Sequence, residues 1–271
     1  MSIDRHHARN AKRIFFVSII VWVIVTIVLV MEYKKGTLFT SEKENLKLIS
    51  VVIPAFGLFI YSFMEKRRSK ILKKEIYNIE NSELFEQQKF VVRKEVGIFQ
   101  VITYFGLDGS ALGFLKEEYD FVIQRVWQVV LSFLLKGLHK QQFYLYNHSG
   151  ERLLRVQKEM GVRNFYTFSN IDGKKIGELK QVLSLTKWEW TFLGMDGEEI
   201  GKVAGDFSAT MQKIDWRDGT HIDVKEDGIP LEAVKYFSAS GGSLVTASIS
   251  EQAELPRAVY YSAAAIVTIK N

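Results

Sequence analysis

The chain has 271 residues, an apolar fraction of 47%, a formal net charge of +5 and no cysteine. This length suits one large or two modest folded domains, and the lack of cysteine excludes a thiol nucleophile or a thiolate metal site. The charge is unevenly divided. Residues 1–75 carry 14 Lys/Arg and 6 Asp/Glu, whereas residues 76–271 carry 22 and 25. The excess of positive charge therefore belongs to the N-terminal part, and we expect no nucleic-acid partner.

Two apolar runs lie near the N-terminus, at about 14–31 and 47–64. A bilayer core is spanned by about 20 apolar residues in a helix, and backbone polar groups in lipid must be satisfied within the segment. We therefore predict a transmembrane helical hairpin over residues 1–65. A signal peptide is the alternative for the first run, but the run is longer than the usual apolar region and no Ala-x-Ala-like site follows it.

The charges that flank the two runs predict their orientation. Ten basic residues lie before the first run or after the second, and four lie in the loop between the runs. The ten are Arg5, Arg9, Lys12, Arg13, Lys66, Arg67, Arg68, Lys70, Lys73 and Lys74; the four are Lys34, Lys35, Lys43 and Lys47. Because basic loops stay in the cytoplasm, we predict a multi-pass protein of the cell (cytoplasmic) membrane. Its N-terminus and its C-terminal domain would both be cytoplasmic.

A basic cluster directly follows the second run, at the start of a charged connector over residues 66–88. It consists of Lys66, Arg67, Arg68, Lys70, Lys73 and Lys74. Such a cluster attracts anionic lipid by about 1 kcal/mol per charge near the membrane surface. We take these six residues as a candidate lipid-binding site. The alternative is that they only fix the topology, and both can hold.

From residue 89 the pattern becomes that of β-strands, interrupted once. Over residues 120–138, apolar side chains recur at helical spacing and polar ones occupy the opposite side, which predicts an amphipathic helix. Two placements stay open for this helix. It packs on the sheet, or it lies on the membrane surface.

A turn sequence recurs five times and is the most informative pattern in this part. Each copy has a glycine followed by apolar residues three and six positions later, and four copies have Asp before the glycine. The five glycines are Gly109, Gly150, Gly173, Gly197 and Gly228. Asp-Gly between apolar runs is a strong hairpin signal, because both turn residues must tolerate positive φ. We predict a series of β-hairpins that stack or close into a barrel.

The chain ends in a segment, 256–269, that is apolar or small on nearly every side after Pro256. Proline suits the first turn of a helix, and a helix that is apolar all round is usually buried. For residues 89–271 we therefore predict a mainly β (α+β) fold. It is a closed antiparallel β-barrel of repeated hairpins around a hydrophobic C-terminal helix.

A hairpin series followed by the apolar stretch PRAVYYSAAAIVTI resembles the tubby-like superfamily. The resemblance covers about residues 89–271 and extends to the LURP-one-related proteins of bacteria and plants and, more distantly, to the phospholipid scramblases. It implies a closed barrel threaded by the C-terminal helix. It brings no motif from which functional residues could be transferred. The 120–138 helix and the two-span anchor are additions to the family pattern.

Few residues suggest catalysis or metal binding, and we expect no catalytic site, cofactor or metal. Asp108, Asp172, Asp196 and Asp227 occupy equivalent turn positions, but a calcium site needs six to eight converging oxygens, so we interpret them as turn formers. The adjacent His6 and His7 are interpreted as solvated residues of a mobile basic leader.

Together these patterns predict a membrane-anchored, non-enzymatic binding module that faces the inner leaflet. Its ligand would be anionic membrane lipid or a protein partner. One alternative is lipid movement similar to that of the phospholipid scramblases. Another is a membrane-anchored pleckstrin-homology-like domain, which also pairs a β-barrel with one C-terminal helix.

Overall fold

The computed structural model describes residues 3–34, 42–75, 83–95, 99–119, 140–161, 163–182, 188–205, 210–237 and 242–268. The chain divides into two compact units, one over Ser2–Tyr77 and one over Asn78–Asn271. The helix predicted over 120–138 lies outside the described residues, as does the part of the connector over 76–82.

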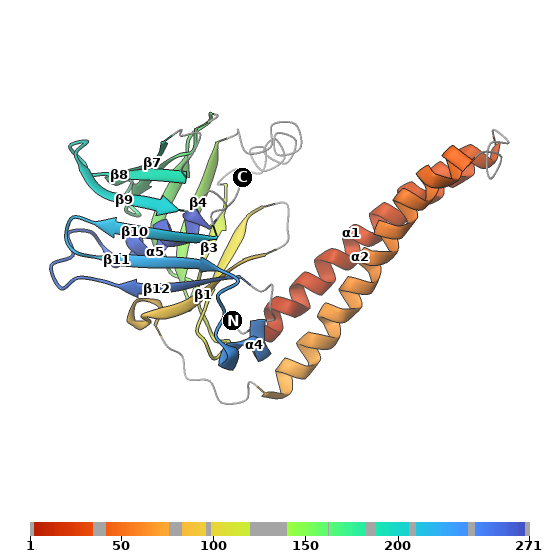
Figure 1. The fold of residues 1–271 in the computed structure, drawn as a ribbon, viewed down its shortest axis with the longest axis horizontal. Helices are drawn as coiled ribbons and strands as arrows, with labels where there is room; N and C mark the ends of the chain where they lie inside the picture. Colours follow the sequence, from red (N-terminus) through yellow and green to blue (C-terminus); the bar gives the residue numbers. More distant parts are fainter. Residues whose placement is uncertain are drawn as a thin grey trace. The chain divides into compact units, whose positions relative to one another are not determined.

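The first unit is a pair of long helices, α1 (Ile3–Lys34) and α2 (Glu42–Glu75), which lie side by side (Figure 1). They run antiparallel, because His7 contacts Glu65 near one end and the rings of Phe15 and Phe59 lie 5.9 Å apart further along. Both helices extend beyond the predicted spans. In particular, α2 continues to Glu75, so that the beginning of the predicted connector is helical.

The two helices contact each other through small side chains. On α1, Ala11, Ser18 and Val25 are buried at intervals of seven residues; on α2, Ala55 and Ser62 are buried at the same interval. A seven-residue spacing keeps one face of each helix against its partner. Small residues on that face let the two backbones approach closely, as in membrane helix pairs.

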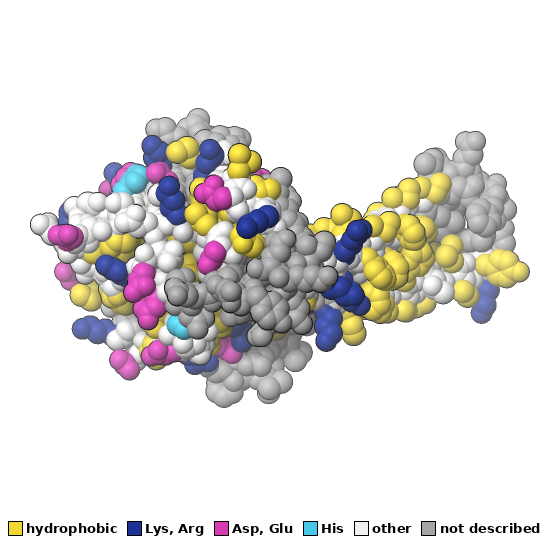
Figure 2. Space-filling view, turned by 90° about the horizontal axis from the view of Figure 1, so that it is seen from below, with side chains coloured by type: hydrophobic (Ala, Val, Ile, Leu, Met, Phe, Trp, Pro, Cys, Tyr) yellow, Lys and Arg dark blue, Asp and Glu magenta, His cyan; other side chains and the backbone are white. Residues whose placement is uncertain are grey.

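The remaining surface of the pair is apolar and exposed. Phe16 and Val23 of α1 are 68% and 53% exposed, and Ile53 and Met64 of α2 are 65% and 63% exposed. Figure 2 shows hydrophobic side chains along the surface of the pair. Among the described residues, one helix is long and apolar enough to cross a membrane. It is α1 over His7–Met31, with a mean hydropathy of 3.1 and only 17% of its apolar window buried. The second span, over 47–64, stays a prediction.

The second unit is a closed antiparallel β-barrel, to which the described residues contribute twelve strands. Each strand pairs with its neighbours in sequence, and β1 pairs with β12 to close the barrel. The strands are β1 (Lys89–Glu95), β2 (Val101–Phe105), β3 (Ala111–Glu117), β4 (Gln141–Asn147), β5 (Arg152–Lys158), β6 (Phe165–Ser169), β7 (Lys175–Val182), β8 (Trp188–Leu193), β9 (Glu199–Gly205), β10 (Met211–Trp216), β11 (His221–Glu226) and β12 (Ser243–Ser248). The mainly β barrel expected from the sequence is confirmed.

Four of the five predicted hairpin turns are present. Gly109, Gly150, Gly173 and Gly197 join consecutive strands with φ between 82° and 86°, a conformation that glycine adopts without steric cost. The aspartate before the glycine acts in the turn itself. The Asp108 carboxylate accepts hydrogen bonds from the backbone N–H and the hydroxyl of Ser110, at 2.9 and 2.7 Å.

The fifth predicted turn is wrong. At Asp227-Gly228 the positive φ belongs to Asp227 (53°), and the chain continues into helix α4 (Leu231–Phe237) instead of a strand. Pro230 explains the change. Its carbonyl accepts hydrogen bonds from the N–H groups of Ala233 and Val234 at the start of the helix, where proline is favoured. The fifth hairpin turn lies earlier, at Gly219 (φ 85°), between β10 and β11.

Three hairpins carry a second glycine, four residues after the turn glycine: Gly113, Gly177 and Gly201. At Gly201 the indole of Trp216 lies against the backbone, and a Cβ there would lie 2.7 Å from Trp216 Cδ1. At Gly177 a Cβ would lie 2.7 Å from a ring carbon of Phe192. Gly177 and Gly201 therefore make room for large aromatic side chains of the core, whereas a Cβ at Gly113 would lie 2.5 Å from the backbone carbonyl oxygen of Tyr146.

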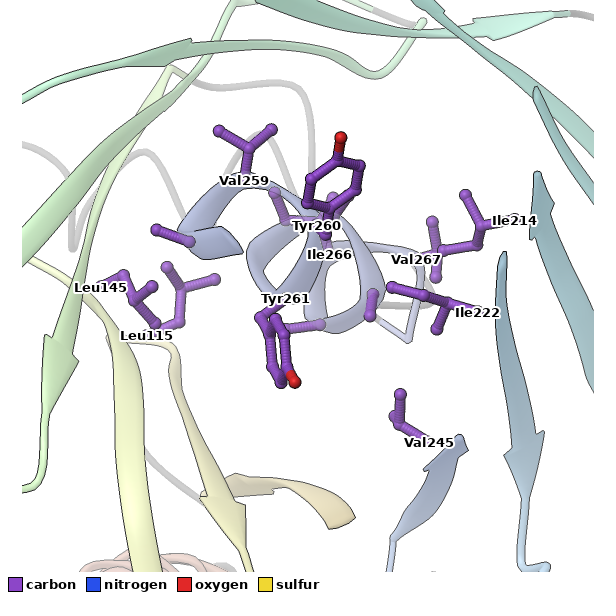
Figure 3. Packing of buried hydrophobic residues seen from close by; sticks show 14 of the residues in the cluster. Leu115, Leu145, Ile214, Ile222, Val245, Val259, Tyr260, Tyr261, Ile266 and Val267 are labelled. Carbon is purple, nitrogen blue, oxygen red and sulfur yellow. The ribbon is translucent and has the colours of Figure 1, made fainter. Parts of the chain in front are cut away.

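The C-terminal helix α5 (Arg257–Val267) belongs to the hydrophobic core of this unit. Its residues from Ala258 to Val267 are all buried, and all of them except Ser262 share one cluster with apolar residues of the strands. Figure 3 shows the helix between strands that carry Leu115 and Leu145 on one side and Ile214 and Ile222 on the other.

Tyrosine hydroxyls tie α5 to its surroundings. Tyr104 of β2 donates to the Tyr261 carbonyl at 3.2 Å, and Tyr261 donates to the Gln87 carbonyl at 2.9 Å. Gln87 directly follows the short helix η1 (Leu84–Glu86). Since a buried hydroxyl needs a partner, these bonds fix the position of the helix as well as satisfying the two tyrosines.

Candidate functional site

The candidate lipid-binding residues of the sequence all lie on α2. Lys66, Arg67 and Lys70 have exposed side chains. Arg68, Lys73 and Lys74 belong to the same helix, and their side chains are outside what the structure describes. In an α-helix, positions 66, 67, 70, 73 and 74 fall within about 120° of the circumference. A continuous helix therefore gathers five of the six basic positions on one side.

The residue before this cluster is engaged elsewhere. The Glu65 carboxylate lies 2.6 Å from Nδ1 of His7, across the two helices. His7 is 0% exposed and Glu65 is 5% exposed. The interpretation of His7 as a solvated residue of a mobile leader is thus wrong, because α1 already begins at Ile3 and carries His7 into a buried contact.

A second polar cluster lies in the barrel, where β3 ends and β4 begins. Glu117 is 4% exposed, and three groups donate to its carboxylate. Oε1 accepts from the Tyr119 hydroxyl at 2.6 Å and from Nε2 of Gln141 at 3.3 Å, and Oε2 accepts from the Gln100 N–H at 2.7 Å. Burial of the phenol is the main reason why the pKa of Tyr119 is raised, and the Glu117 carboxylate raises it further.

Lys158 adds a positive charge to this cluster. It ends β5, opposite Gln141 of β4, and it is completely buried. Burial lowers the pKa of Lys158, and the carboxylate of Glu117 counteracts part of that effect. A buried charge is tolerated when an opposite charge and hydrogen bonds accompany it, so Glu117 and Lys158 stabilise each other inside the barrel.

A small cavity of about 100 Å³ borders the same cluster. Its lining residues are Phe99, Lys116, Glu117, Glu118 and Tyr119. Both carboxylates are already engaged, because Glu118 bonds to Lys116 and Arg152 at 3.2 Å each and also accepts from the Tyr146 hydroxyl. The cavity therefore has polar walls whose charges are neutralised within the protein, an arrangement typical of a structural network.

Within the described ranges, no group of three or more His, Asp or Glu side chains is arranged to hold a metal ion. The nearest approach to one is His221 between Asp215 and Asp223, where each imidazole nitrogen faces a different carboxylate. Because both nitrogens are occupied, this group is suited to an imidazolium ion pair. The hydrogen bond that His221 donates to the Asp215 carboxylate is the largest reason why the pKa of His221 is raised.

Sequence reasoning missed Glu117, Lys158 and the His7–Glu65 pair. The alternation of inward and outward side chains along a strand could have revealed Glu117 and Lys158. In β5, Leu154, Val156 and Lys158 occupy every second position, and Lys158 therefore falls on the core face. Glu117 follows Leu115 in the same way in β3. Nothing in the sequence relates His7 to Glu65, because their contact depends on how the two helices align.

The chain matches no protein-family model, and no curated protein shows significant sequence similarity to it.

Proposed function

We propose that this protein is a membrane-anchored, non-enzymatic binding module, held in the bilayer by α1 and α2. The observation that carries the proposal is the exposed apolar surface of the two helices. Residues such as Phe16 and Ile53 are more than half exposed. Monomeric soluble proteins seldom expose an apolar surface of this extent, which is typical of a membrane interaction site.

In this proposal both helices cross the membrane, and their charged ends set the orientation. The basic residues that precede and follow the pair keep the N-terminus and the barrel on the cytoplasmic side. The contact of small residues between α1 and α2 supports the two-span arrangement, because lipid offers no hydrophobic drive for helix pairing and close packing must replace it.

The ligand that we propose is anionic lipid of the inner leaflet, bound by the cluster Lys66, Arg67, Arg68, Lys70, Lys73 and Lys74. The helical course of α2 supports this assignment, since it places most of these residues on one side of a rigid element directly beyond the membrane. Each charge near the surface contributes about 1 kcal/mol of attraction. A protein partner is the alternative ligand.

We also propose that the barrel is tubby-like, with α5 passing through its interior. The closed barrel and the burial of α5 among inward-facing strand residues support this idea. In such a domain the helix fills the barrel, and ligands must bind at the surface or outside the barrel. This agrees with a lipid site on the connecting helix.

The absence of cysteine from the chain allows a direct test of the orientation. Ser149 lies exposed in the β4–β5 turn, and Thr37 lies in the predicted external loop. In S149C a membrane-impermeant maleimide should label the protein only in inverted vesicles, and in T37C only in right-side-out vesicles. Labelling of both variants from the same side would contradict the two-span anchor.

Lipid binding is tested with the full chain in vesicles that mix phosphatidylcholine and phosphatidylglycerol. Spin-labelled forms of each lipid report which one is retained at the protein. We expect a preference for phosphatidylglycerol that is lost when the six cluster residues are changed to Gln. A control with Lys89, Lys174, Lys213 and Lys225 changed to Gln, all exposed on the barrel, should keep it. Equal retention of both lipids by the unmodified protein would overturn the lipid proposal and favour a protein partner.

A further inference from the structure

The contact between His7 and Glu65 determines which charges are presented at one end of the helical pair. It joins the beginning of α1 to the last third of α2, with 2.6 Å between Nδ1 and Oε2. Basic residues of both helices lie within two turns of this contact. Lys12 on α1 is exposed, as are Lys66 and Lys70 on α2. Figure 2 shows dark blue side chains at the end of the apolar surface of the pair.

Glu65 has a particular place among these charges. Of the side chains that the structure describes in α1 and α2, it is the only acidic one. It directly precedes Lys66 and Arg67 in sequence, and one turn of helix separates it from Ser69 and Lys70. A solvated carboxylate at this position would pair with neighbouring cations and reduce their attraction for an anionic surface.

The structure keeps this carboxylate away from solvent. Glu65 is 5% exposed, whereas Lys66, Arg67 and Lys70 are exposed. Its partner His7 is completely buried. The acidic group is therefore turned into the helix pair and the basic groups are turned outward, so the described surface at this end is cationic.

We propose that His7 is a positioning residue that withdraws Glu65, so that α1 and α2 together present one cationic surface to anionic phospholipid headgroups. This surface comprises Lys12 from α1 and Lys66, Arg67 and Lys70 from α2. It enlarges the cluster expected from the sequence, because it recruits the first helix and assigns a role to its buried histidine. The inference rests on the proposed function.

The experiment measures retention of spin-labelled phosphatidylglycerol relative to phosphatidylcholine by the full chain in mixed vesicles. H7A removes the contact with the buried imidazole that turns Glu65 into the helix pair, so that its carboxylate can turn toward the basic surface. We expect the relative association constant for phosphatidylglycerol to fall by up to about fivefold, which corresponds to one charge near the membrane. K12Q should produce a decrease of similar size.

The double variant H7A/E65Q separates this role from a merely structural one. It also lacks His7, but it has no carboxylate to release, and we expect it to recover the preference of the unmodified protein. A loss of preference in H7A that E65Q does not restore would overturn the inference. It would mean that His7 acts by holding the helices together.

Failure of this inference is distinguishable from failure of the proposed function. If K66Q/R67Q/K70Q loses the preference while H7A and K12Q keep it, lipid binding stands and the role of α1 and His7 is refuted. If the unmodified protein shows no preference, the lipid proposal itself fails, and this inference fails with it.

Discussion

Tyr260 of α5 donates its phenolic O–H to the carboxylate of Asp218, which lies in the turn between β10 and β11. Asp218 also accepts from the backbone N–H groups of Thr220 and Glu254, at 2.8 and 3.1 Å. Partial burial acts to raise the pKa of Asp218, but the hydrogen bonds from Tyr260 and from the two backbone groups hold it below its ordinary value. One carboxylate thus connects a hairpin turn, the segment before α5 and the helix itself.

Removing the Tyr260 hydroxyl should destabilise the barrel. In Y260F the carboxylate loses one of its donors, and we expect the free energy of unfolding to fall by about 1.5–3 kcal/mol, as for a hydrogen bond to a charged group. Denaturant unfolding of the detergent-solubilised chain measures this. As a control, D172N removes the aspartate that corresponds to Asp218 in another turn, one that is exposed to solvent. It should have little effect on the free energy of unfolding.

The effect of Y260F should also depend on pH. Because the pKa of Asp218 is lowered by folding, its contribution is fully present above the ordinary Asp value of about 3.9 and is lost as the pH falls through the folded value. The free energies of unfolding of Y260F and the unmodified protein should therefore converge at low pH. A difference that stays constant across the titration would refute the role of the ionised carboxylate.

Glu117→Gln should destabilise the barrel where β3 ends and β4 begins. The amide keeps the shape of the side chain but places an NH₂ group where Tyr119, Gln141 or the Gln100 N–H now donates, and it removes the negative charge that acts to raise the pKa of Lys158. We expect the free energy of unfolding to fall by about 1–3 kcal/mol, as when a buried hydrogen-bonding group is left unsatisfied. E159Q, at the partly exposed residue that follows β5, serves as the control. Equal unfolding midpoints for the two variants would contradict the prediction.

His221 should make stability decrease in mildly alkaline conditions. Its pKa is raised by folding, so its contribution is complete below the unfolded value of about 6.5. It is lost as the pH rises through the folded value. The pair is partly exposed, and we expect at most about 1 kcal/mol. The difference in melting temperature between the unmodified protein and H221Q should shrink as the pH rises, whereas H148Q should match the unmodified protein throughout. A difference that grows with pH would contradict this assignment.

Gly201→Ala should disturb the core although it adds a single methyl group. The new Cβ would lie 2.7 Å from Trp216 Cδ1, and overpacking of this kind costs about 1–3 kcal/mol. The double variant G201A/W216L provides room for the methyl group. If the close contact is the cause, the cost of G201A should be clearly smaller in the W216L background. If G201A destabilises the protein equally in both backgrounds, the cause is a change in the backbone and not the contact with Trp216.

Ala55→Phe should separate the two helices, because Ala55 is 0% exposed at their contact. Gly57→Phe is the matched control, since a Cβ at Gly57 meets no atom within 4 Å. Cysteines placed at Ala11 and Ser62, which lie between the His7–Glu65 and Phe15–Phe59 contacts, should form a disulfide in the G57F background. The yield should fall strongly in the A55F background. Equal yields would show that Ala55 does not set the approach of the helices.

Much of the barrel could be predicted because its turns need one residue type. At Gly109, Gly150, Gly173 and Gly197 the backbone has a positive φ that strongly favours glycine, so the repeat is visible in the sequence. Gly228 shares the local sequence but not the outcome. There Pro230 begins a helix, because its carbonyl accepts hydrogen bonds from Ala233 and Val234, and the chain leaves the hairpin pattern.

The candidate sites were less predictable, because they depend on contacts between distant residues. The basic cluster of α2 is contiguous and was visible. The pairing of His7 with Glu65 spans 58 residues, and that of Tyr260 with Asp218 spans 42. Such contacts follow from the alignment of whole elements, which periodicity does not determine. Alternation along the strands would have placed Glu117 and Lys158 on the core face, but it would not have shown that they lie in one cluster.

The pairing of β1 with β12 has a consequence for the order of events during synthesis. The first strand begins at Lys89, and its partner ends at Ser248. Until the ribosome has released the last part of the chain, β1 has one free edge and the interior lacks α5. In the proposed two-span anchor, the helical pair is made before the barrel and would enter the membrane early. The barrel would thus mature while already tethered, and a chain that stops before α5 would leave an unfinished sheet beside the bilayer, a natural substrate for quality control.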